Sequence, residues 1–462
     1  MVSNDTPAQS SMSADVAVIG FGKGGKTLAA ALGRMGRRVV MIEQSDRMYG
    51  GTCINIGCVP TKSMVFRAEE APSHPSPEIY HDAVIATAAL TDRLRAENFT
   101  MLDSLATVEV LTGTASFVDA HTLVVRGTAT TTVTADIIVV GTGSEPVWPE
   151  VPGLAGNPRA VTSTEMLGTE QLPGRVVVLG GGYVGLEFAA MYAAYGSSVT
   201  ILERRPGLLQ HEDTEISAAA LDLVTSAGVA VLPSAVVTSV DGSRVHYERE
   251  GLRASISADT ILVALGRRPV TAGLNLQNAG ITTRPDGSID VDDHLRTSQS
   301  HIFAVGDVNG GPQFTYVSLD DYRIVLDQLT GAGTRRVSDR AAVPYVLFLT
   351  PPLARVGLTE RAALDAGHRI KVACLPVEKM ATVPRARIVN QTRGLMKVVV
   401  DASTDFILGA ALLSYDAHEV INTVSLAMRY GISASQLRDE IFTHPSMTEA
   451  FNQLLDSLRD PA

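Results

Sequence analysis

The strongest constraint on the fold is an internal repeat. Residues 15–43 read DVAVIGFGKGGKTLAAALGRMGRRVVMIE, and residues 175–203, at an offset of 160, read RVVVLGGGYVGLEFAAMYAAYGSSVTILE. The two segments align without a gap. Each predicts a strand, a G-x-G-x-x-G turn, a helix and a second strand that ends in glutamate. Two such units at matching spacing predict two dinucleotide-binding domains.

The three glycines of each unit have separate roles at a dinucleotide. The first permits a tight turn, the second lets the backbone approach a pyrophosphate, and the third lets helix and strand pack closely. The helix N-terminus offers unpaired N–H groups to the phosphates, and the terminal glutamate accepts hydrogen bonds from ribose hydroxyls. The candidate residues are Gly20, Gly22, Gly25 and Glu43 in the first unit and Gly180, Gly182, Gly185 and Glu203 in the second.

A close pair of cysteines follows the first unit, in the run GGTCINIGCVPTK at residues 50–62. The chain contains 3 cysteines in 462 residues, so the pair is not part of a disulfide framework. Cys53 and Cys58 predict a redox disulfide beside a nucleotide cofactor, with a structural zinc site or incidental thiols as the alternatives. A redox disulfide needs both an electron source and a mediator, which explains the need for two dinucleotides.

The composition argues against several other functions. A formal net charge of −11 disfavours general affinity for nucleic acid or anionic membranes. No apolar run approaches the ~20 residues that span a bilayer. The first 13 residues, MVSNDTPAQSSMS, lack the basic start and apolar stretch of a signal peptide and read as a polar leader. We therefore expect a cytoplasmic protein, in which a close cysteine pair is catalytic or metal-binding.

The rest of the chain falls into strands and helices around the two units. Apolar strands that end in glycine turns are expected within residues 135–146, 258–269 and 301–307. From about residue 344 the pattern changes to antiparallel strands, including 395–400 and 407–413. Helical patterns follow at residues 418–430 and 447–458.

With these motifs in this order, the chain resembles the pyridine nucleotide-disulfide oxidoreductases, among them dihydrolipoamide dehydrogenase, glutathione reductase and mercuric reductase. The resemblance covers nearly the whole chain. It rests on both glycine fingerprints, the GGTCxNxGCxPxK run, the Gly-Asp pair at 306–307 and a C-terminal His-Pro segment. The runs IGFGKGGKTLA, YGGTCINIGC and QFTYVSLDDYRIV are further similar to the bacterial reactive-chlorine-resistance flavoproteins, a mercuric-reductase-like branch.

The resemblance implies an α/β fold with two Rossmann-like dinucleotide-binding domains, for FAD and NAD(P), and a C-terminal α+β dimerisation domain. The expected divisions are a flexible leader at 1–13, a first FAD-binding part with the redox disulfide at 14–150, an NAD(P)-binding domain at 151–270, a second FAD-binding or central part at 271–340 and a dimerisation domain at 341–462.

The resemblance also places the cofactors. FAD would lie on the first unit, with Glu43 at its adenosine ribose and Asp307 near its ribityl chain. NADH or NADPH would lie on the second unit and pass hydride to the flavin. Tyr183 resembles the ring that covers the flavin until nicotinamide displaces it, although simple packing is the alternative. Further cofactor contacts are expected from Gly51, Thr52, Thr142, Gly143 and Gly266.

The family mechanism gives each cysteine its own role. Cys58 would form the charge-transfer thiolate next to the flavin, and Cys53, nearer solvent, would attack the substrate. Lys62 and Glu187 resemble the ion pair beside flavin and nicotinamide.

A proton carrier is also needed, and His444 in FTHPSMTE fits this role, with Glu449 orienting its imidazole. By itself a single histidine is more often structural. In the family this histidine reaches the disulfide of the other subunit, so the resemblance implies an obligate homodimer.

Some positions depart from the family pattern. Phe442 replaces the first histidine of His-x-His-Pro, Pro352 replaces a common glutamate, and residues 313–322 are unusual. The C-terminal cysteine pair of mercuric reductases is absent from the sequence.

These departures lie where family members shape the substrate region, so the acceptor stays open. We expect an FAD-dependent NAD(P)H:disulfide oxidoreductase that reduces a low-molecular-weight disulfide or an oxidant-stress product, with no resident metal. A mercuric or cupric ion reductase and a flavin-bound redox sensor with little turnover are the alternatives. Glu203 favours NADH because a carboxylate repels a 2′-phosphate, whereas Arg204 and Arg205 fit NADPH.

Overall fold

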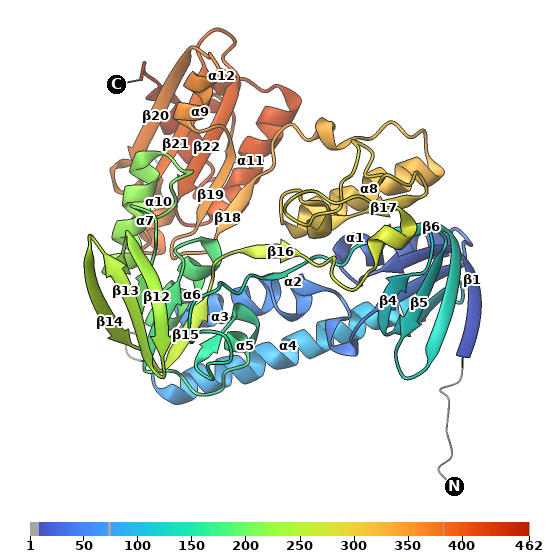
Figure 1. Cartoon of the computed structure of the whole chain (residues 1–462). Coiled ribbons are helices and arrows are strands. Elements are labelled where there is room, and N and C mark those ends of the chain that lie inside the picture. Colours follow the sequence, from blue (N-terminus) through green and yellow to red (C-terminus); the bar gives the residue numbers. More distant parts are fainter. Residues whose placement is uncertain (1–8, 73–74, 382, 462) are drawn as a thin grey trace. The chain divides into compact units, whose positions relative to one another are not determined.

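The computed structural model describes residues 9–72, 75–381 and 383–461 and has an α/β fold (Figure 1). Its residues group into two compact units, which are Met1–Ser63, Asp82–Val147 and Gly266–Arg340 in the first, and Met64–His81, Trp148–Leu265 and Ala341–Ala462 in the second. Each unit combines segments from more than one expected domain, so the domain borders inferred above stay predictions. Within the described residues, no helix is both long and apolar enough to cross a membrane.

The first unit is built on a seven-stranded sheet in the order β3-β2-β1-β6-β5-β4, with β17 also pairing with β6. The core strands β1, β2, β3, β6 and β17 run parallel, and β4 and β5 add an antiparallel edge. All five residues of β2 are buried, as expected for a strand covered on both faces. The strands of this sheet are β1 (Gln9–Ile19), β2 (Val39–Glu43), β3 (Val108–Thr112), β4 (Thr114–Phe117), β5 (Thr122–Arg126), β6 (Thr130–Val140) and β17 (Ile302–Ala304). A separate antiparallel pair consists of β7 (Ser144–Pro146) and β16 (Arg267–Pro269).

Helices of the first unit connect these strands and carry the cysteine run. They are α1 (Lys23–Arg34), α2 (Thr52–Asn55), the start of α3 (Cys58–Glu69), most of α4 (Pro77–Asp103) and α8 (Thr315–Thr330), with short 3-10 turns at Asp46–Met48, Leu276–Ala279, Gly306–Asn309 and Val337–Asp339. Strand β1 already begins at Gln9, so the expected leader does not extend to residue 13. Its first eight residues lie outside the described part of the chain.

The second unit contains three sheets. The first is parallel, in the order β11-β10-β9-β15-β8, and the second is the antiparallel meander β12-β13-β14. These strands are β8 (Ala160–Val161), β9 (Arg175–Leu179), β10 (Ser198–Leu202), β11 (Ala230–Leu232), β12 (Ala235–Asp241), β13 (Arg244–Arg249), β14 (Leu252–Ser257) and β15 (Thr260–Val263). The helices beside them are α5 (Ser163–Leu167), α6 (Tyr183–Ala194) and α7 (Thr214–Ser226).

The third sheet is the expected C-terminal antiparallel layer, coloured orange to red in Figure 1. Its order is β18-β19-β22-β21-β20, and its strands are β18 (Tyr345–Leu347), β19 (Leu353–Gly357), β20 (Ile370–Pro376), β21 (Leu395–Asp401) and β22 (Ile407–Leu413). The accompanying helices are α9 (Glu360–Asp365), the 3-10 turn Val377–Lys379, α10 (Pro384–Ile388), α11 (Ala417–Tyr430), α12 (Ala434–Arg438) and α13 (Ala450–Asp456). A helix over 447–458 was expected, but α13 is shorter because Glu449 acts as its N-cap.

The structure confirms the internal repeat. The β1–α1–β2 and β9–α6–β10 segments match, and both helices begin directly after the second glycine of their fingerprint. Gly20 and Gly180 have φ angles of +102° and +103°. A Cβ on either glycine would approach a backbone carbonyl oxygen to 2.2 or 2.6 Å, so the turn requires glycine at both positions.

Candidate functional site

Neither the backbone conformation nor a protein contact requires glycine at the second position of each fingerprint, so a bound ligand is the reason for it. Gly22 and Gly182 have φ angles of −67° and −77°, which any residue can adopt. A Cβ on Gly182 would meet no atom within 4 Å, and one on Gly22 only the Gly141 carbonyl oxygen at 3.8 Å. A side chain there would instead fill the space at the helix N-terminus where a pyrophosphate binds. Both repeats, residues 15–43 and 175–203, therefore fit a dinucleotide.

Glu43 and Glu203, the glutamates that end the two repeats, each accept a hydrogen bond from the same backbone position. The Phe21 backbone N–H donates to Glu43 Oε2 at 2.9 Å, and the Gly181 N–H donates to Glu203 Oε2 at 2.7 Å. Phe21 and Gly181 are equivalent positions of the repeat. Each carboxylate thus holds its glycine turn and keeps acceptor capacity for a ribose hydroxyl. Burial raises the pKa of Glu43.

Glu203 and the two arginines that follow it differ in how they are held. The backbone N–H of Arg205 donates to Glu203 Oε1 at 2.8 Å, which keeps this carboxylate at the end of β10. The side chains of Arg204 and Arg205 are exposed.

Asp307 is held at the end of β17 by a chain of hydrogen bonds. Ser144 Oγ donates to Asp307 Oδ2 at 2.6 Å, and the same hydroxyl accepts from Arg267 Nε at 2.8 Å. Arg267 also donates to the Ser144 carbonyl oxygen. Sequence reasoning missed Ser144 and Arg267, because they lie 123 residues apart and neither belongs to a motif.

Three of the other predicted cofactor contacts, Thr142, Gly143 and Gly266, lie beside Ser144 and Arg267 in the chain, and the other two lie at the start of α2. Thr142 Oγ1 donates to the Val270 carbonyl oxygen at 2.6 Å. Gly143 and Gly266 have φ angles of +72° and +105°, and a Cβ on either would meet no atom within 4 Å. Gly51 is tighter, because its Cβ would lie 2.6 Å from Gly22 Cα. Thr52 is the first residue of α2.

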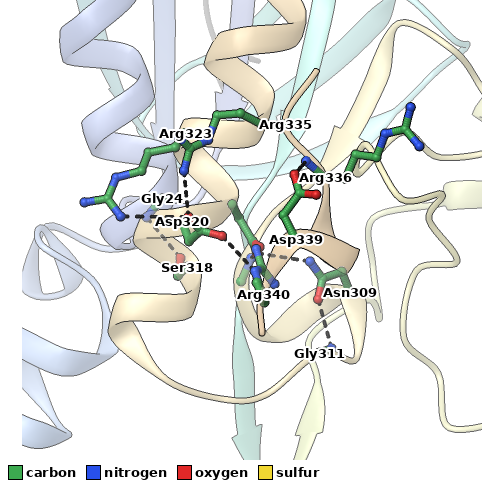
Figure 2. Close-up of polar contacts among 12 residues, drawn as sticks. Gly24, Asn309, Gly311, Ser318, Asp320, Arg323, Arg335, Arg336, Asp339 and Arg340 are labelled. Atoms are coloured by element: carbon green, nitrogen blue, oxygen red, sulfur yellow. Dashed lines mark hydrogen bonds and ion pairs between the residues drawn. The ribbon is translucent and has the colours of Figure 1, made fainter. Parts of the chain in front are cut away.

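Helix α8 supports this region through polar contacts (Figure 2). Ser318 Oγ accepts from the Gly24 backbone N–H of α1 at 3.1 Å. A Cβ on Gly24 would lie 2.7 Å from the Ser318 carbonyl oxygen, so this glycine lets α1 and α8 pack closely. Arg340 pairs with Asp320 and Asp321, and Asp321 accepts from the Gly306 N–H at 2.6 Å beside Asp307. The unusual segment 313–322 thus supports the turn that carries Asp307.

The two cysteines occupy unequal environments. Cys53 lies in α2 and is partly buried, whereas Cys58 is the first residue of α3 and is exposed; both thiols are free. In the chain by itself, Cys58 is therefore the more exposed cysteine, and the expectation that Cys53 lies nearer solvent is wrong for this structure. The hydrogen bond from Cys53 lowers the pKa of the Cys58 thiol to about 6, with help from Thr315 and Lys62. The same bond and burial raise the pKa of Cys53. In the reduced pair the thiolate is therefore on Cys58 and the proton on Cys53.

Two residues near the cysteines were missed in the sequence. Thr315 Oγ1 lies 3.7 Å from Cys58 Sγ, although the two residues are 257 positions apart. Lys26 is only 5% exposed and donates to the Gly50 carbonyl oxygen at 3.0 Å. The sequence offered one signal for Lys26, which is that this lysine falls among the small and apolar residues of the helix KGGKTLAAALGR.

The ring of Tyr183 lies against a second aromatic ring, that of Tyr345. Tyr183 is the first residue of α6, and its ring stacks on Tyr345 with centroids 5.5 Å apart. The Tyr345 hydroxyl donates to the Glu212 carboxylate. Glu187 is buried and accepts from the Phe348 N–H at 2.9 Å. Lys62 belongs to the first unit and Glu187 to the second, and their pairing stays a prediction.

His444 and Glu449 contact each other directly. His444 Nδ1 and Glu449 Oε2 are 2.8 Å apart, and the other carboxylate oxygen accepts from the Ser446 N–H at 2.8 Å. The His444 side chain is 67% exposed, whereas that of Glu449 is 13% exposed. The carboxylate thus holds one ring nitrogen and leaves the exposed imidazole able to exchange protons.

Comparison with known proteins shows the family. A family model described as pyridine nucleotide-disulphide oxidoreductase matches residues 14–321, and the dimerisation domain of the same family matches residues 343–455. The chain belongs to this family. It is 44% identical over 443 residues to the probable pyridine nucleotide-disulfide oxidoreductase RclA of Escherichia coli strain K12, covering 96% of this chain and 98% of that relative.

A second relative and a solved structure support the same family assignment. Mercuric reductase of Staphylococcus aureus is 34% identical over 451 residues, covering 94% of this chain and 80% of that enzyme. A solved structure described as the Cu(II) complex of the HOCl-induced flavoprotein disulfide reductase RclA from Escherichia coli superposes with a TM-score of 0.91 at 44% identity. It covers 96% of this chain and 99% of that one.

These matches confirm the family and the similarity to the reactive-chlorine-resistance branch. The α/β architecture with two dinucleotide-binding domains and a C-terminal dimerisation domain is also confirmed. The chain is an oxidoreductase of the flavoprotein disulfide reductase type, and its cofactors are FAD and NAD(P)H.

Proposed function

We propose that this flavoprotein reduces a low-molecular-weight disulfide, or a related product of oxidant stress, through Cys53 and Cys58. The observation that carries this choice is the 2.8 Å contact between His444 and Glu449. Cleaving a disulfide releases a thiolate, and protonating it requires an acid at the reaction site. A held but exposed imidazole supplies such an acid.

The protein residues have the following roles in this proposal. His444 takes the proton of Cys53, whose sulfur attacks the substrate disulfide and forms a mixed disulfide with one half. The departing thiolate takes the proton back from His444. The Cys58 thiolate then attacks Cys53 Sγ, which breaks the mixed disulfide, releases the second half as thiolate and forms the Cys53–Cys58 disulfide.

The cofactors complete the electron balance. When bound, FAD would supply the two-electron transfer between NAD(P)H and the Cys53–Cys58 disulfide. The net reaction converts NAD(P)H, one proton and RSSR into NAD(P)⁺ and two RSH. We propose that Glu43 and Asp307, with the glycines and threonines around them, hold FAD, and that Glu203 lies at the nicotinamide dinucleotide. From the family resemblance, we propose that Tyr183, Lys62 and Glu187 act in hydride transfer between the two cofactors.

We further infer a homodimer, because a dimerisation domain matches residues 343–455. In this assembly His444 of one subunit serves the cysteine pair of its partner. A cytoplasmic location also belongs to the proposal, since a reduced dithiol persists there.

Reduction of a soft metal ion is the second candidate. It is favoured by the similarity to a protein solved as a Cu(II) complex and to mercuric reductases. Thiolates bind such ions well, and transferring electrons to an ion releases no thiol that needs a proton.

Anaerobic turnover separates the two candidates. NADH or NADPH oxidation is measured with a panel of disulfides and with cupric and mercuric ions, for the wild type, His444→Ala and the exposed control His81→Ala. We expect His444→Ala to slow disulfide turnover by about 100-fold and His81→Ala to leave it unchanged. Ion-dependent turnover that survives His444→Ala, without disulfide turnover in the wild type, would replace the proposal with a metal-ion reductase.

A further inference from the structure

We propose that Lys26 is the counter-charge of Cys53. Its buried ammonium group holds the loop that carries this cysteine and stabilises the Cys53 thiolate as it attacks the substrate. Lys26 is a positioning residue in this inference, which rests on the proposed role of Cys53.

Lys26 reaches the cysteine loop from the fingerprint helix α1. Its Nζ donates to the Gly50 carbonyl oxygen at 3.0 Å and to Asn98 Oδ1 of α4. Gly50 precedes Cys53 by three residues and has a φ angle of +98°. The lysine thus binds the strained turn that leads into α2.

Other residues already hold this loop without help from Lys26. Asn55 Nδ2 donates to the carbonyl oxygens of Tyr49 and Gly51, both at 2.9 Å. Asn55 Oδ1 in turn accepts from Arg95 Nε of α4 at 2.8 Å. A neutral donor at position 26 would suffice to bind one more carbonyl oxygen, so the loop geometry alone does not explain a charged group.

The hydrogen-bond partners of Lys26 among the described residues are neutral groups, the Gly50 carbonyl oxygen and the Asn98 side-chain amide. In the part of the chain that the structure describes, no Asp or Glu forms an ion pair with Lys26. Burying an ammonium group without a counter-ion is unfavourable. Burial accordingly lowers the pKa of Lys26 to about 8, with Lys23 adding to this, and the acidic group that opposes the decrease is Cys53.

Lys26 in turn lowers the pKa of Cys53. The hydrogen bond to Cys58 and burial raise the pKa of Cys53, whereas Thr315 and Lys26 lower it. Thr315 is neutral, so Lys26 is the cation among these influences. A lysine with a pKa of about 8 carries its charge at neutral pH, when Cys53 has to react.

The pH dependence of Cys53 alkylation tests this inference. The FAD-loaded enzyme is reduced anaerobically and treated with iodoacetamide, and the labelled cysteine is identified by mass spectrometry at each pH. Lys26→Gln keeps an N–H donor but loses the charge, and Lys26→Met is a second neutral variant of similar length that suits a buried position. Lys23→Gln removes a charge from the first turn of the same helix.

We expect both Lys26 variants to move the alkylation profile of Cys53 toward higher pH, with a loss of about tenfold in rate at pH 7, equivalent to one pKa unit. Lys23→Gln leaves Lys26 charged at pH 7 and should not move the Cys53 profile toward higher pH. FAD content is measured on the same samples. An unchanged Cys53 profile would overturn the inference, and an unchanged profile with lost FAD would assign the lysine to the cofactor phosphates. The proposed function places Cys58 against the bound flavin, where iodoacetamide cannot reach it. Labelling of Cys58 in place of Cys53 in the FAD-loaded wild type would therefore overturn the proposed function.

Discussion

Thr315 Oγ1 lies 3.7 Å from Cys58 Sγ and joins the first turn of α8 to the first turn of α3. The hydroxyl is one of the groups that lower the pKa of the Cys58 thiol. A contact across 257 residues therefore favours the ionised form of the Cys58 thiol.

Removing this hydroxyl should make the thiolate harder to form. In Thr315→Val we expect the pKa of Cys58 to rise by about 1–2 units, because a hydrogen bond to a charged group contributes about 1.5–3 kcal/mol. The long-wavelength thiolate–flavin absorbance of the reduced enzyme, titrated with pH, measures the change. Thr315→Ser keeps the hydroxyl and serves as the control; the same shift in both variants would point to packing instead.

The thiolate–flavin absorbance of the reduced wild-type enzyme should also depend on pH. Because the pKa of Cys58 is lowered to about 6, the thiolate should persist at neutral pH and disappear as the pH falls through about 6. The absorbance of the reduced enzyme should therefore fall to half near this pH. A midpoint near 9, the ordinary value of a thiol, would contradict the unequal environments of the two cysteines.

Arg267 should matter for cofactor retention. In Arg267→Leu, Ser144 loses both of its contacts with the guanidinium, and Asp307 loses its fixed position. We expect a drop in FAD affinity of about tenfold, from one or two lost hydrogen bonds. Arg268→Ala removes an exposed pair with Glu145 and is the matched control. FAD release on dilution, followed by flavin fluorescence, distinguishes the two variants.

Glu449 should act only on the disulfide half of the reaction. Glu449→Gln keeps a hydrogen-bonding group next to His444 but loses the charge that stabilises the imidazolium. We expect disulfide turnover to fall by about tenfold or more, with an unchanged rate of flavin reduction by NAD(P)H in stopped flow. Glu419→Gln, on exposed surface of α11, should change neither rate. A matching loss in both half-reactions of Glu449→Gln would indicate a structural role.

The buried charges between α7 and the C-terminal sheet should contribute strongly to stability. Arg355 pairs with Glu212 and Asp213 at 2.9 Å each, and all three side chains are at most 5% exposed. Arg355→Ala leaves two buried carboxylates without this partner and should cost about 3–5 kcal/mol. Arg361→Ala removes a pair in which both side chains are at least 70% exposed and should have a negligible effect. Thermal unfolding of the FAD-loaded proteins compares them.

The sequence alone determined the features that depend on neighbouring residues. The glycine turns at Gly20 and Gly180 and the helices that follow them are local, because turn geometry and helix start depend on a few adjacent positions. The same holds for the spacing of Cys53 and Cys58, and for His444 with Glu449 five residues later. Short-range patterns therefore predicted both dinucleotide-binding units and identified the candidate chemistry.

Only the tertiary structure decided which distant groups surround that chemistry. Lys26 is an ordinary lysine in the sequence, yet packing of α1 buries it and turns its charge toward the cysteine loop. Thr315 and Arg267 became relevant for the same reason, since they approach Cys58 and Asp307 through folding rather than spacing. The hydrogen bond between the two cysteines shifts the pKa of each thiol most, and burial and the Thr315 contact also shift it. Burial and the Thr315 contact do not exist until the chain has folded.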